Sequence, residues 1–262
     1  MDKDDIQLAK RFDLHGKTAL ITGSARGIGR AIAIGLAEFG CRVIVHGSRD
    51  SEPLRTALEK VKAFSPESFS VYADLNNRDA VDAMLQEIAG KGISPDILVA
   101  NASVQYRVPW DKITEEEALT QMRINFHATL QLVQGLAPAM IERKWGRIVT
   151  VGSVQERRPH PQMAVYAASK GAQENLVRNL AFQFAQYRVT VNNLCPGVFA
   201  TDRNAEALEN PVYAKQVTDA IPMHDYALPA DAAGAALLLC SEAGRYITGA
   251  TLMVDGGLSL PK

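Results

Sequence analysis

The sequence predicts an α/β fold in which one doubly wound sheet of about seven parallel strands is covered by helices on both faces. Short runs rich in β-branched residues alternate with longer segments whose apolar residues have helical spacing. The expected strands are almost continuously apolar, which is typical of strands buried on both faces of a parallel sheet. No Pro-, Ser- or Gly-rich linker divides the chain, so residues 1–262 are expected to form a single domain.

The helical intervals pack one apolar face on this sheet. Ile28, Ile32 and Leu36 follow the first strand with the spacing of such a helix, and Leu176, Leu180 and Phe184 form a second stripe. No fixed-period repeat is present, which excludes solenoids and propellers. The expected strands, in order, are residues 18–22, 42–46, 68–72, 96–100, 147–151, 189–194 and 251–254.

The composition excludes several classes of protein. The 262 residues are 47% apolar and 22% charged, which is enough to bury a large core. A formal net charge of -1 gives no broad attraction to nucleic acid or to a membrane, so neither partner is expected. Three cysteines without a Cys-x-x-Cys pair predict no disulfide framework or zinc site. Residues 1–5 are charged and lead into no apolar run, so we expect no targeting segment and a cytoplasmic location.

A glycine-rich segment stands between the first expected strand and the first expected helix. Gly23, Gly27 and Gly29 have the spacing G-x-x-x-G-x-G. Glycine lacks the Cβ that blocks a tight turn or the approach of a phosphate, and the following helix offers free N–H groups. The position of the segment favours a Rossmann-type dinucleotide site over an ordinary glycine-rich turn.

The end of the second expected strand favours NADP over NAD. An acidic side chain at this place usually binds the ribose 2′-hydroxyl and repels a 2′-phosphate. Here residues 46–49 hold no carboxylate; Ser48 can donate a hydrogen bond, and Arg49 and Arg26 can pair with a phosphate. The alternative is that both arginines are solvated and that Asp50 turns back to the ribose.

A candidate catalytic group follows further along the chain. Tyr166 and Lys170 are four residues apart, so a helix places them on one face, where the ammonium can lower the pKa of the phenol. Ser153 follows the fifth strand, at the edge where open α/β sheets bind ligands, and could hold a substrate oxygen beside the phenol. The alternative for the pair alone is a half-buried tyrosine and a lysine with its stem on apolar surface.

Taken together, these motifs resemble the short-chain dehydrogenase/reductase family over about residues 14–258. The matching positions are 22–29 for the glycine motif, Asp74 and Leu75 after the third strand, 100–103 after the fourth, Asn125, Ser153, Tyr166 and Lys170 for the active-site tetrad, Pro196, Gly197, Val198 and Thr201 at the nicotinamide, and 246–249 and 254–257 near the C-terminus. Ala100 and Ser103 depart from the family, which usually has Asn and Gly there.

The resemblance implies an NAD(P)-dependent oxidoreductase that interconverts an alcohol and a ketone by hydride transfer without a metal. Tyr166 would transfer the proton and Ser153 orient the substrate oxygen, while Lys170 would lower the pKa of Tyr166 and Asn125 would position a water. A homotetramer is implied, with contacts through the 166–184 helix and the C-terminal strand. The expected cofactor contacts are Gly23, Ser24, Arg26, Gly27, Ile28, Gly29, Ser48, Arg49, Asp74, Leu75, Asn101, Ala102, Tyr166, Lys170, Pro196, Gly197, Val198 and Thr201.

The loops at the strand ends predict the substrate. They are polar and cationic, which suits an anionic, polyhydroxylated molecule better than an acyl chain or steroid, although each arginine alone could face solvent or a subunit contact. Local segments are similar to the gluconate 5-dehydrogenase branch, which predicts a sugar acid or keto-sugar substrate such as gluconate and 5-ketogluconate. The candidate substrate residues are Gln105, Arg107, Gln155, Arg158, His160 and Phe199.

Two other functions are compatible with these motifs, and one segment is expected to be mobile. A 3-oxoacyl-[acyl-carrier-protein] reductase carries the same motif set, and a non-catalytic cofactor-binding protein would need no intact tetrad. Residues 202–228 lack a strong period and are expected to form a substrate lid among the most mobile parts of the chain.

Overall fold

The computed structural model describes residues 7–261, and their strands form one seven-stranded parallel sheet in the order β3-β2-β1-β4-β5-β6-β7. The predicted fold class is confirmed. Residues 1–5, where no targeting signal is expected, lie outside the described residues. The strands are β1 Thr18–Ile21, β2 Arg42–Gly47, β3 Phe69–Tyr72, β4 Ile97–Ala100, β5 Gly146–Val151, β6 Val189–Pro196 and β7 Thr251–Val254.

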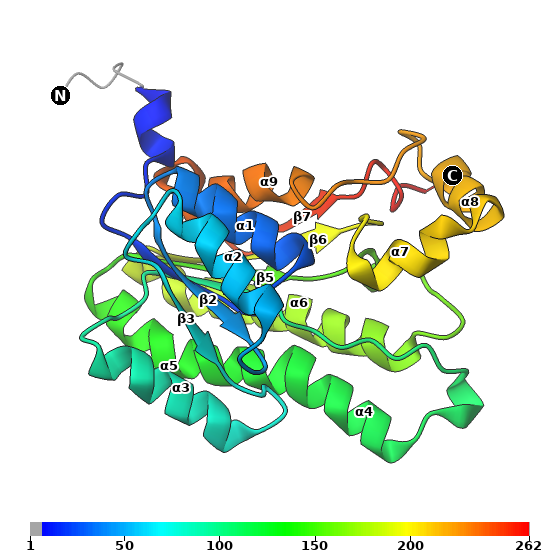
Figure 1. Ribbon diagram of the computed structural model, residues 1–262, viewed down its shortest axis with the longest axis horizontal. Coiled ribbons are helices and arrows are strands. Elements are labelled where there is room, and N and C mark those ends of the chain that lie inside the picture. Colours follow the sequence, from blue (N-terminus) through cyan, green and yellow to red (C-terminus); the bar gives the residue numbers. More distant parts are fainter. Residues whose placement is uncertain (1–6, 262) are drawn as a thin grey trace.

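Helices cover both faces of the sheet (Figure 1). One face carries α1 Gly27–Glu38, α2 Glu52–Lys62 and α9 Asp231–Cys240, and the other carries α3 Arg78–Gly90, α4 Glu115–Met122, α5 Ala128–Glu142 and α6 Ala164–Phe184. Short helical turns are η1 Leu8–Phe12, η2 Trp110–Lys112, η4 Val154–Glu156, η5 Ala185–Tyr187 and η6 Glu242–Gly244, and η3 Arg123–His127 is a π-helical turn between α4 and α5.

The predicted apolar stripes pack as expected. Ile32 and Leu36 of α1 are fully buried in the core on one face, while Leu180 and Phe184 of α6 are half-buried against the core on the other. The first half of α6 differs, because its buried face carries polar side chains such as Lys170 and Gln173. This face of α6 therefore contributes polar side chains to a candidate functional site as well as apolar side chains to the core.

The strand order reverses between β1 and β4, and side chains tie the two strand ends together there. Thr22 Oγ1 accepts hydrogen bonds from the backbone N–H groups of Asn101 and Ala102, both at 3.0 Å. The side-chain amide of Asn101 donates to the carbonyl oxygens of Thr22 at 2.9 Å and Gly23 at 3.1 Å. Open α/β sheets bind ligands at such a reversal point, so this junction places the candidate site.

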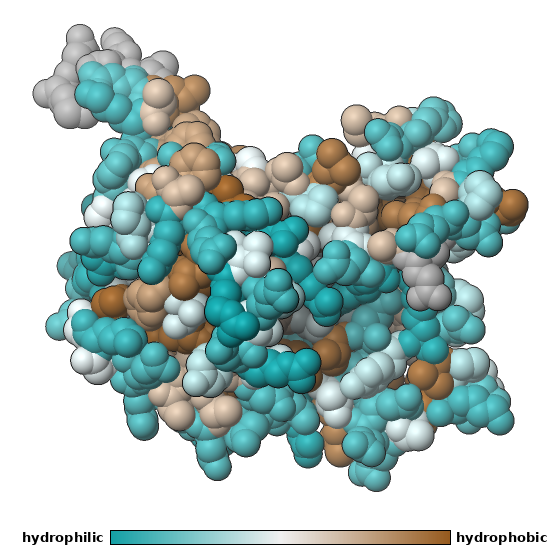
Figure 2. Space-filling view, viewed as in Figure 1, coloured by the Kyte–Doolittle hydropathy of each residue, from teal (hydrophilic) through white to brown (hydrophobic). Residues whose placement is uncertain are grey.

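Two helices lie beyond the carboxyl ends of the strands, α7 Asp202–Glu209 and α8 Pro211–Ala220 (Figure 1). They belong to the segment 202–228 expected as a lid. Figure 2 shows hydrophobic side chains on the lobe that they form, and Val212, Met223 and Leu228 are exposed. The motion of this segment stays a prediction.

Among residues 7–261, no helix combines the length and the hydropathy that crossing a membrane would need.

Candidate active site

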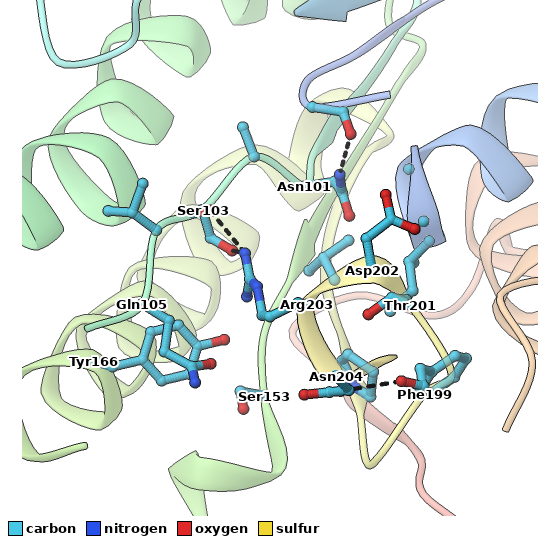
Figure 3. A pocket seen from close by; sticks show the side chains of 18 of the residues that line it. Asn101, Ser103, Gln105, Ser153, Tyr166, Phe199, Thr201, Asp202, Arg203 and Asn204 are labelled. Carbon is cyan, nitrogen blue, oxygen red and sulfur yellow. Dashed lines mark hydrogen bonds between the residues drawn. The ribbon is translucent and has the colours of Figure 1, made fainter. Parts of the chain in front are cut away.

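A cavity of about 860 Å³ opens at the carboxyl ends of the strands, between the sheet and α7. Its walls bring together the glycine segment, the ends of β2, β4, β5 and β6, and the first turn of α7 (Figure 3). The expected residues on its wall are Gly23, Arg26, Gly27, Ile28, Gly29, Ser48, Arg49, Asp74, Leu75, Asn101, Ala102, Ser153, Tyr166, Pro196, Gly197, Val198 and Thr201. All six candidate substrate residues, Gln105, Arg107, Gln155, Arg158, His160 and Phe199, line it as well.

The glycine segment has the geometry of a phosphate cradle. Gly23 and Gly27 have φ values of 63° and 56°, which favour glycine. A Cβ on Gly29 would lie 2.4 Å from the side-chain nitrogen of Asn101 and 2.5 Å from the carbonyl oxygen of Gly23. No side chain caps the N-terminus of α1 at Arg26, so the first N–H groups of the helix point at the cavity without a protein acceptor. The chain therefore fits a pyrophosphate here.

The expected 2′-phosphate residues lie on the same wall. Ser48 and Arg49 line the cavity. Asp50 does not line it, because its carboxylate accepts a hydrogen bond from Arg55 at 2.7 Å. The alternative in which Asp50 turns back to the ribose is thus not the arrangement of this structure.

His46 supports the glycine segment from below. It is buried at the end of β2, where its Nδ1 accepts from Gly23 N–H at 3.1 Å and its Nε2 lies 3.1 Å from the carbonyl oxygen of Ala73. These contacts require the neutral ring with the proton on Nε2. Burial lowers the pKa of His46 to about 4.

Ser24 does not lie on the cavity wall, contrary to the expected cofactor contact. Its side chain is fully buried, where its hydroxyl donates to Ile21 O at 2.8 Å and accepts from His46 N–H at 2.9 Å. Ser24 shapes the turn from beneath, because a small hydroxyl satisfies two buried backbone groups there.

Tyr166 and Ser153 both line the cavity (Figure 3). Ser153 follows β5, and its hydroxyl also accepts from Gln155 N–H at 3.2 Å, which starts the turn η4. Tyr166 lies in the first turns of α6 and is 5% exposed. Ser153 and Arg203 both lower the pKa of the phenol, against the effect of burial. The pair can therefore hold one substrate oxygen and exchange a proton with it.

Lys170 lies behind Tyr166 and off the wall. Its Nζ donates to Val151 O at 2.7 Å and to Gln173 Oε1 at 3.1 Å. Gln173 in turn donates to Thr129 Oγ1 at 3.0 Å, and Thr129 donates to the carbonyl oxygen of Asn125 at 3.2 Å. Burial of the ammonium, with the charge of Arg203, lowers the pKa of Lys170 to about 7.

Asn125 is fully buried and stands in the π-helical turn η3. Its side-chain oxygen accepts from Val104 N–H at 2.9 Å, and its amide donates to Val104 O at 3.0 Å and Ser169 Oγ at 3.0 Å. A π-helical turn is frequent at functional sites because it redirects a side chain or carbonyl. Here it ties the loop after β4 to α6.

The electrostatics of Tyr166 differ from the expectation that Lys170 lowers its pKa. Burial raises the pKa of the phenol, and the groups that counteract burial are Arg203 and Ser153. The Nζ of Lys170 lies 6.0 Å from the centre of the tyrosine ring and donates to Val151 instead. Helical spacing places the two residues on one face of α6. The buried ammonium of Lys170 nevertheless donates its hydrogen bond to the carbonyl oxygen of Val151 in β5.

Three functional candidates escaped the sequence analysis. Arg203 of α7 lines the cavity, and its charge lowers the pKa of Tyr166. Gln173 accepts from Lys170. Glu156 accepts from Ser153 N–H at 3.0 Å and from Asn193 at 2.9 Å, and burial raises its pKa. Of these three residues, Glu156 could have been found from the sequence, because it stands three residues after Ser153 as in a capping box.

Comparisons with known proteins agree with this site. The family model adh_short_C2, described as enoyl-(acyl carrier protein) reductase, matches residues 23–259. The 5-keto-D-gluconate 5-reductase of Escherichia coli strain K12 is 32% identical over 94% of this chain and 97% of its own length.

Two solved structures extend the comparison. A gluconate 5-dehydrogenase from Burkholderia cenocepacia J2315, in complex with NADP and tartrate, has a TM-score of 0.91 and 32% identity over 97% of this chain and 100% of its own. A 3-oxoacyl (acyl-carrier-protein) reductase from Agrobacterium tumefaciens C58 with NADP bound has a TM-score of 0.91 and 36% identity over 98% of this chain and 99% of its own.

The chain belongs to the short-chain dehydrogenase/reductase family. It is an oxidoreductase of that family.

We expect Gly29→Ala to weaken NADPH binding at least tenfold, because the added methyl group collides with Asn101 and the Gly23 carbonyl. Fluorescence titration with NADPH measures the affinity. Gly234→Ala is the control: nothing lies within 4 Å of its Cβ position in α9, so it should bind normally and gain about 0.5–1 kcal/mol in unfolding free energy. Equal affinity in the two variants would contradict the cradle.

We expect stability to fall as the pH decreases from about 6.5 to about 4, in part because of His46. In this window the unfolded histidine binds a proton while the folded one stays neutral, so protons favour the unfolded chain, by on the order of 3 kcal/mol in total. Urea unfolding at a series of pH values should show a shallower decline for His46→Gln than for the unmodified chain. Identical slopes would show that His46 does not titrate as described.

Proposed function

We propose that this enzyme interconverts a sugar acid and its keto form with NADP(H), in the manner of gluconate and 5-ketogluconate. The observation that supports this proposal is that Ser153 and Tyr166 line one cavity. That cavity has the glycine segment at one end and arginine side chains at the other. The relatives named for gluconate chemistry, and the tartrate in one of them, support a hydroxylated carboxylic acid as the ligand.

The proposed mechanism uses the chain's own groups around the substrate oxygen. NADP(H), when bound, supplies or accepts the hydride. Ser153 holds the substrate oxygen, and Tyr166 gives that oxygen a proton in reduction or takes it back in oxidation. Lys170, whose pKa is lowered to about 7, can exchange protons near neutral pH and anchors α6 to β5 through Val151.

The substrate end of the cavity favours a polar molecule. Arg107, Arg158 and His160 line it, and Gln155 Oε1 is buried there without a hydrogen-bond partner among the described residues. A ligand hydroxyl would satisfy that atom, whereas an acyl chain would leave it unpaired at a cost of about 1–3 kcal/mol.

A 3-oxoacyl-[acyl-carrier-protein] reductase is the second candidate. The Agrobacterium tumefaciens structure of that name, at 36% identity, favours it. The cationic wall and the unpaired Gln155 favour the sugar acid.

We further propose that the enzyme is a single domain that acts as a homotetramer in the cytoplasm, with residues 202–228 as a mobile substrate lid. Phe182 on α6 and Tyr246 before β7 are 88% and 94% exposed, and these surfaces are the ones expected to form contacts between subunits. Burying large apolar side chains of this kind stabilises association.

We expect Tyr166→Phe to lower kcat about 100- to 10,000-fold, because the phenol hydroxyl that transfers the proton is lost. NADPH oxidation followed at 340 nm with 5-ketogluconate, related keto-sugar acids and an acetoacetyl thioester measures both activity and substrate class. The control Tyr72→Phe changes an exposed tyrosine of β3 outside the cavity and should keep kcat. Undiminished activity of Tyr166→Phe would refute the proton-transfer role, and turnover of the thioester alone would replace the sugar-acid assignment.

We expect Arg49→Gln to raise the KM for NADPH about 10- to 100-fold and to leave the KM for NADH nearly unchanged, because only NADPH carries the 2′-phosphate. Asp50→Asn tests the alternative and should change neither value, since Asp50 is held by Arg55. A raised KM for NADH in Asp50→Asn would instead assign Asp50 to the ribose.

A further inference from the structure

Arg203 reaches from the first turn of α7 into the catalytic end of the cavity (Figure 3). Its Nη2 donates to the carbonyl oxygen of Ser103 at 2.8 Å and to the Ser103 hydroxyl at 3.2 Å. The positive charge of the same guanidinium lowers the pKa of the Tyr166 phenol, against the effect of burial. One side chain therefore joins α7 to the loop after β4, beside the proposed proton donor.

The guanidinium has donors left for a ligand. It carries five N–H groups in a planar fork, and its bonds to Ser103 use at most two of them. Two N–H groups are what a carboxylate needs for a bidentate pair. A lysine could not present such a fork, since its ammonium is a point charge.

The distribution of charge around Arg203 also favours the binding of an anionic ligand. None of the ion pairs between described side chains includes Arg203. The neighbouring carboxylate, Asp202, lies 3.7 Å from Arg26 of the glycine segment instead. Arg107 and Arg158 line the same end of the cavity. A negatively charged substrate group would neutralise this excess, and part of the pairing would take place away from bulk water.

We propose that Arg203 binds the carboxylate of the substrate, so that α7 supplies the contact that selects a sugar acid over a neutral ketone. The inference rests on the proposed function and deepens it by naming the residue that recognises the acid group. The substrate oxygen binds at the Tyr166 hydroxyl, and the long, exposed arginine side chain turns its free N–H groups to the carboxylate. Ser103 keeps the guanidinium at the cavity through its carbonyl oxygen.

The test compares Arg203→Met and Arg203→Lys with the unmodified enzyme on two substrates, 5-ketogluconate and the ketohexose in which CH₂OH replaces its carboxylate. We expect Arg203→Met to lower kcat/KM for the acid about 10- to 100-fold more than for the neutral ketose, chiefly through KM. Loss of the charge beside Tyr166 affects both substrates and cancels in this ratio.

Arg203→Lys should recover part of the difference, because it restores the charge without the fork. Arg245→Met, at an exposed arginine outside the cavity, is the control and should change neither substrate.

Fluorescence titration with NADPH tests whether the Arg203 variants lose activity because they bind the cofactor less tightly. The affinity for NADPH should stay within about threefold in both Arg203 variants; a loss comparable to that for the acid would assign Arg203 to the cofactor and overturn the proposal. Equal losses for the acid and the neutral ketose, in an enzyme that turns over the acid, would overturn the role of Arg203 alone. An unmodified enzyme that binds NADPH but accepts only a thioester would overturn the sugar-acid function together with this inference.

Discussion

The hydrogen bonds between Thr22 and Asn101 hold the ends of β1 and β4 together, and the site depends on that junction. It lies where the strand order reverses, so the loops diverge on either side and leave the cavity between them. The same Asn101 amide occupies the space beside Gly29, which explains why a side chain at that glycine would collide. Cofactor cradle and substrate end are therefore joined through one small set of buried polar contacts.

The catalytic end combines burial with ionisable groups. Burial raises the pKa of Tyr166 and lowers that of Lys170, so each change favours the uncharged form of its group. Neighbouring groups offset part of this effect: Ser153 and Arg203 lower the pKa of the phenol, while Val151 and Gln173 accept hydrogen bonds from the ammonium. The pKa of the tyrosine proposed to transfer a proton is thus set by several elements at once.

The segment beyond β6 completes the site from outside the sheet. Phe199 pairs with Ala227 in an isolated bridge, which fixes where α7 begins and returns the chain to the core before α9. From that position Thr201 lies beside Gly27 and Arg203 reaches Ser103. Changes in α7 are therefore a direct route to new substrate specificity that leaves the cofactor cradle intact.

The sequence by itself determined the sheet and indicated the glycine cradle, Tyr166 and Ser153, because buried parallel strands, tight turns and helical spacing leave local patterns along the chain. Asn125 was indicated only by the resemblance to the family. The sequence also placed Lys170 on the face of Tyr166 through their helical spacing. Only the tertiary structure decided that Lys170 donates to Val151, that Asp50 is held by Arg55, and that Arg203 donates to Ser103. These contacts depend on how distant or neighbouring segments fold back, and no local period in the sequence encodes the distances between them.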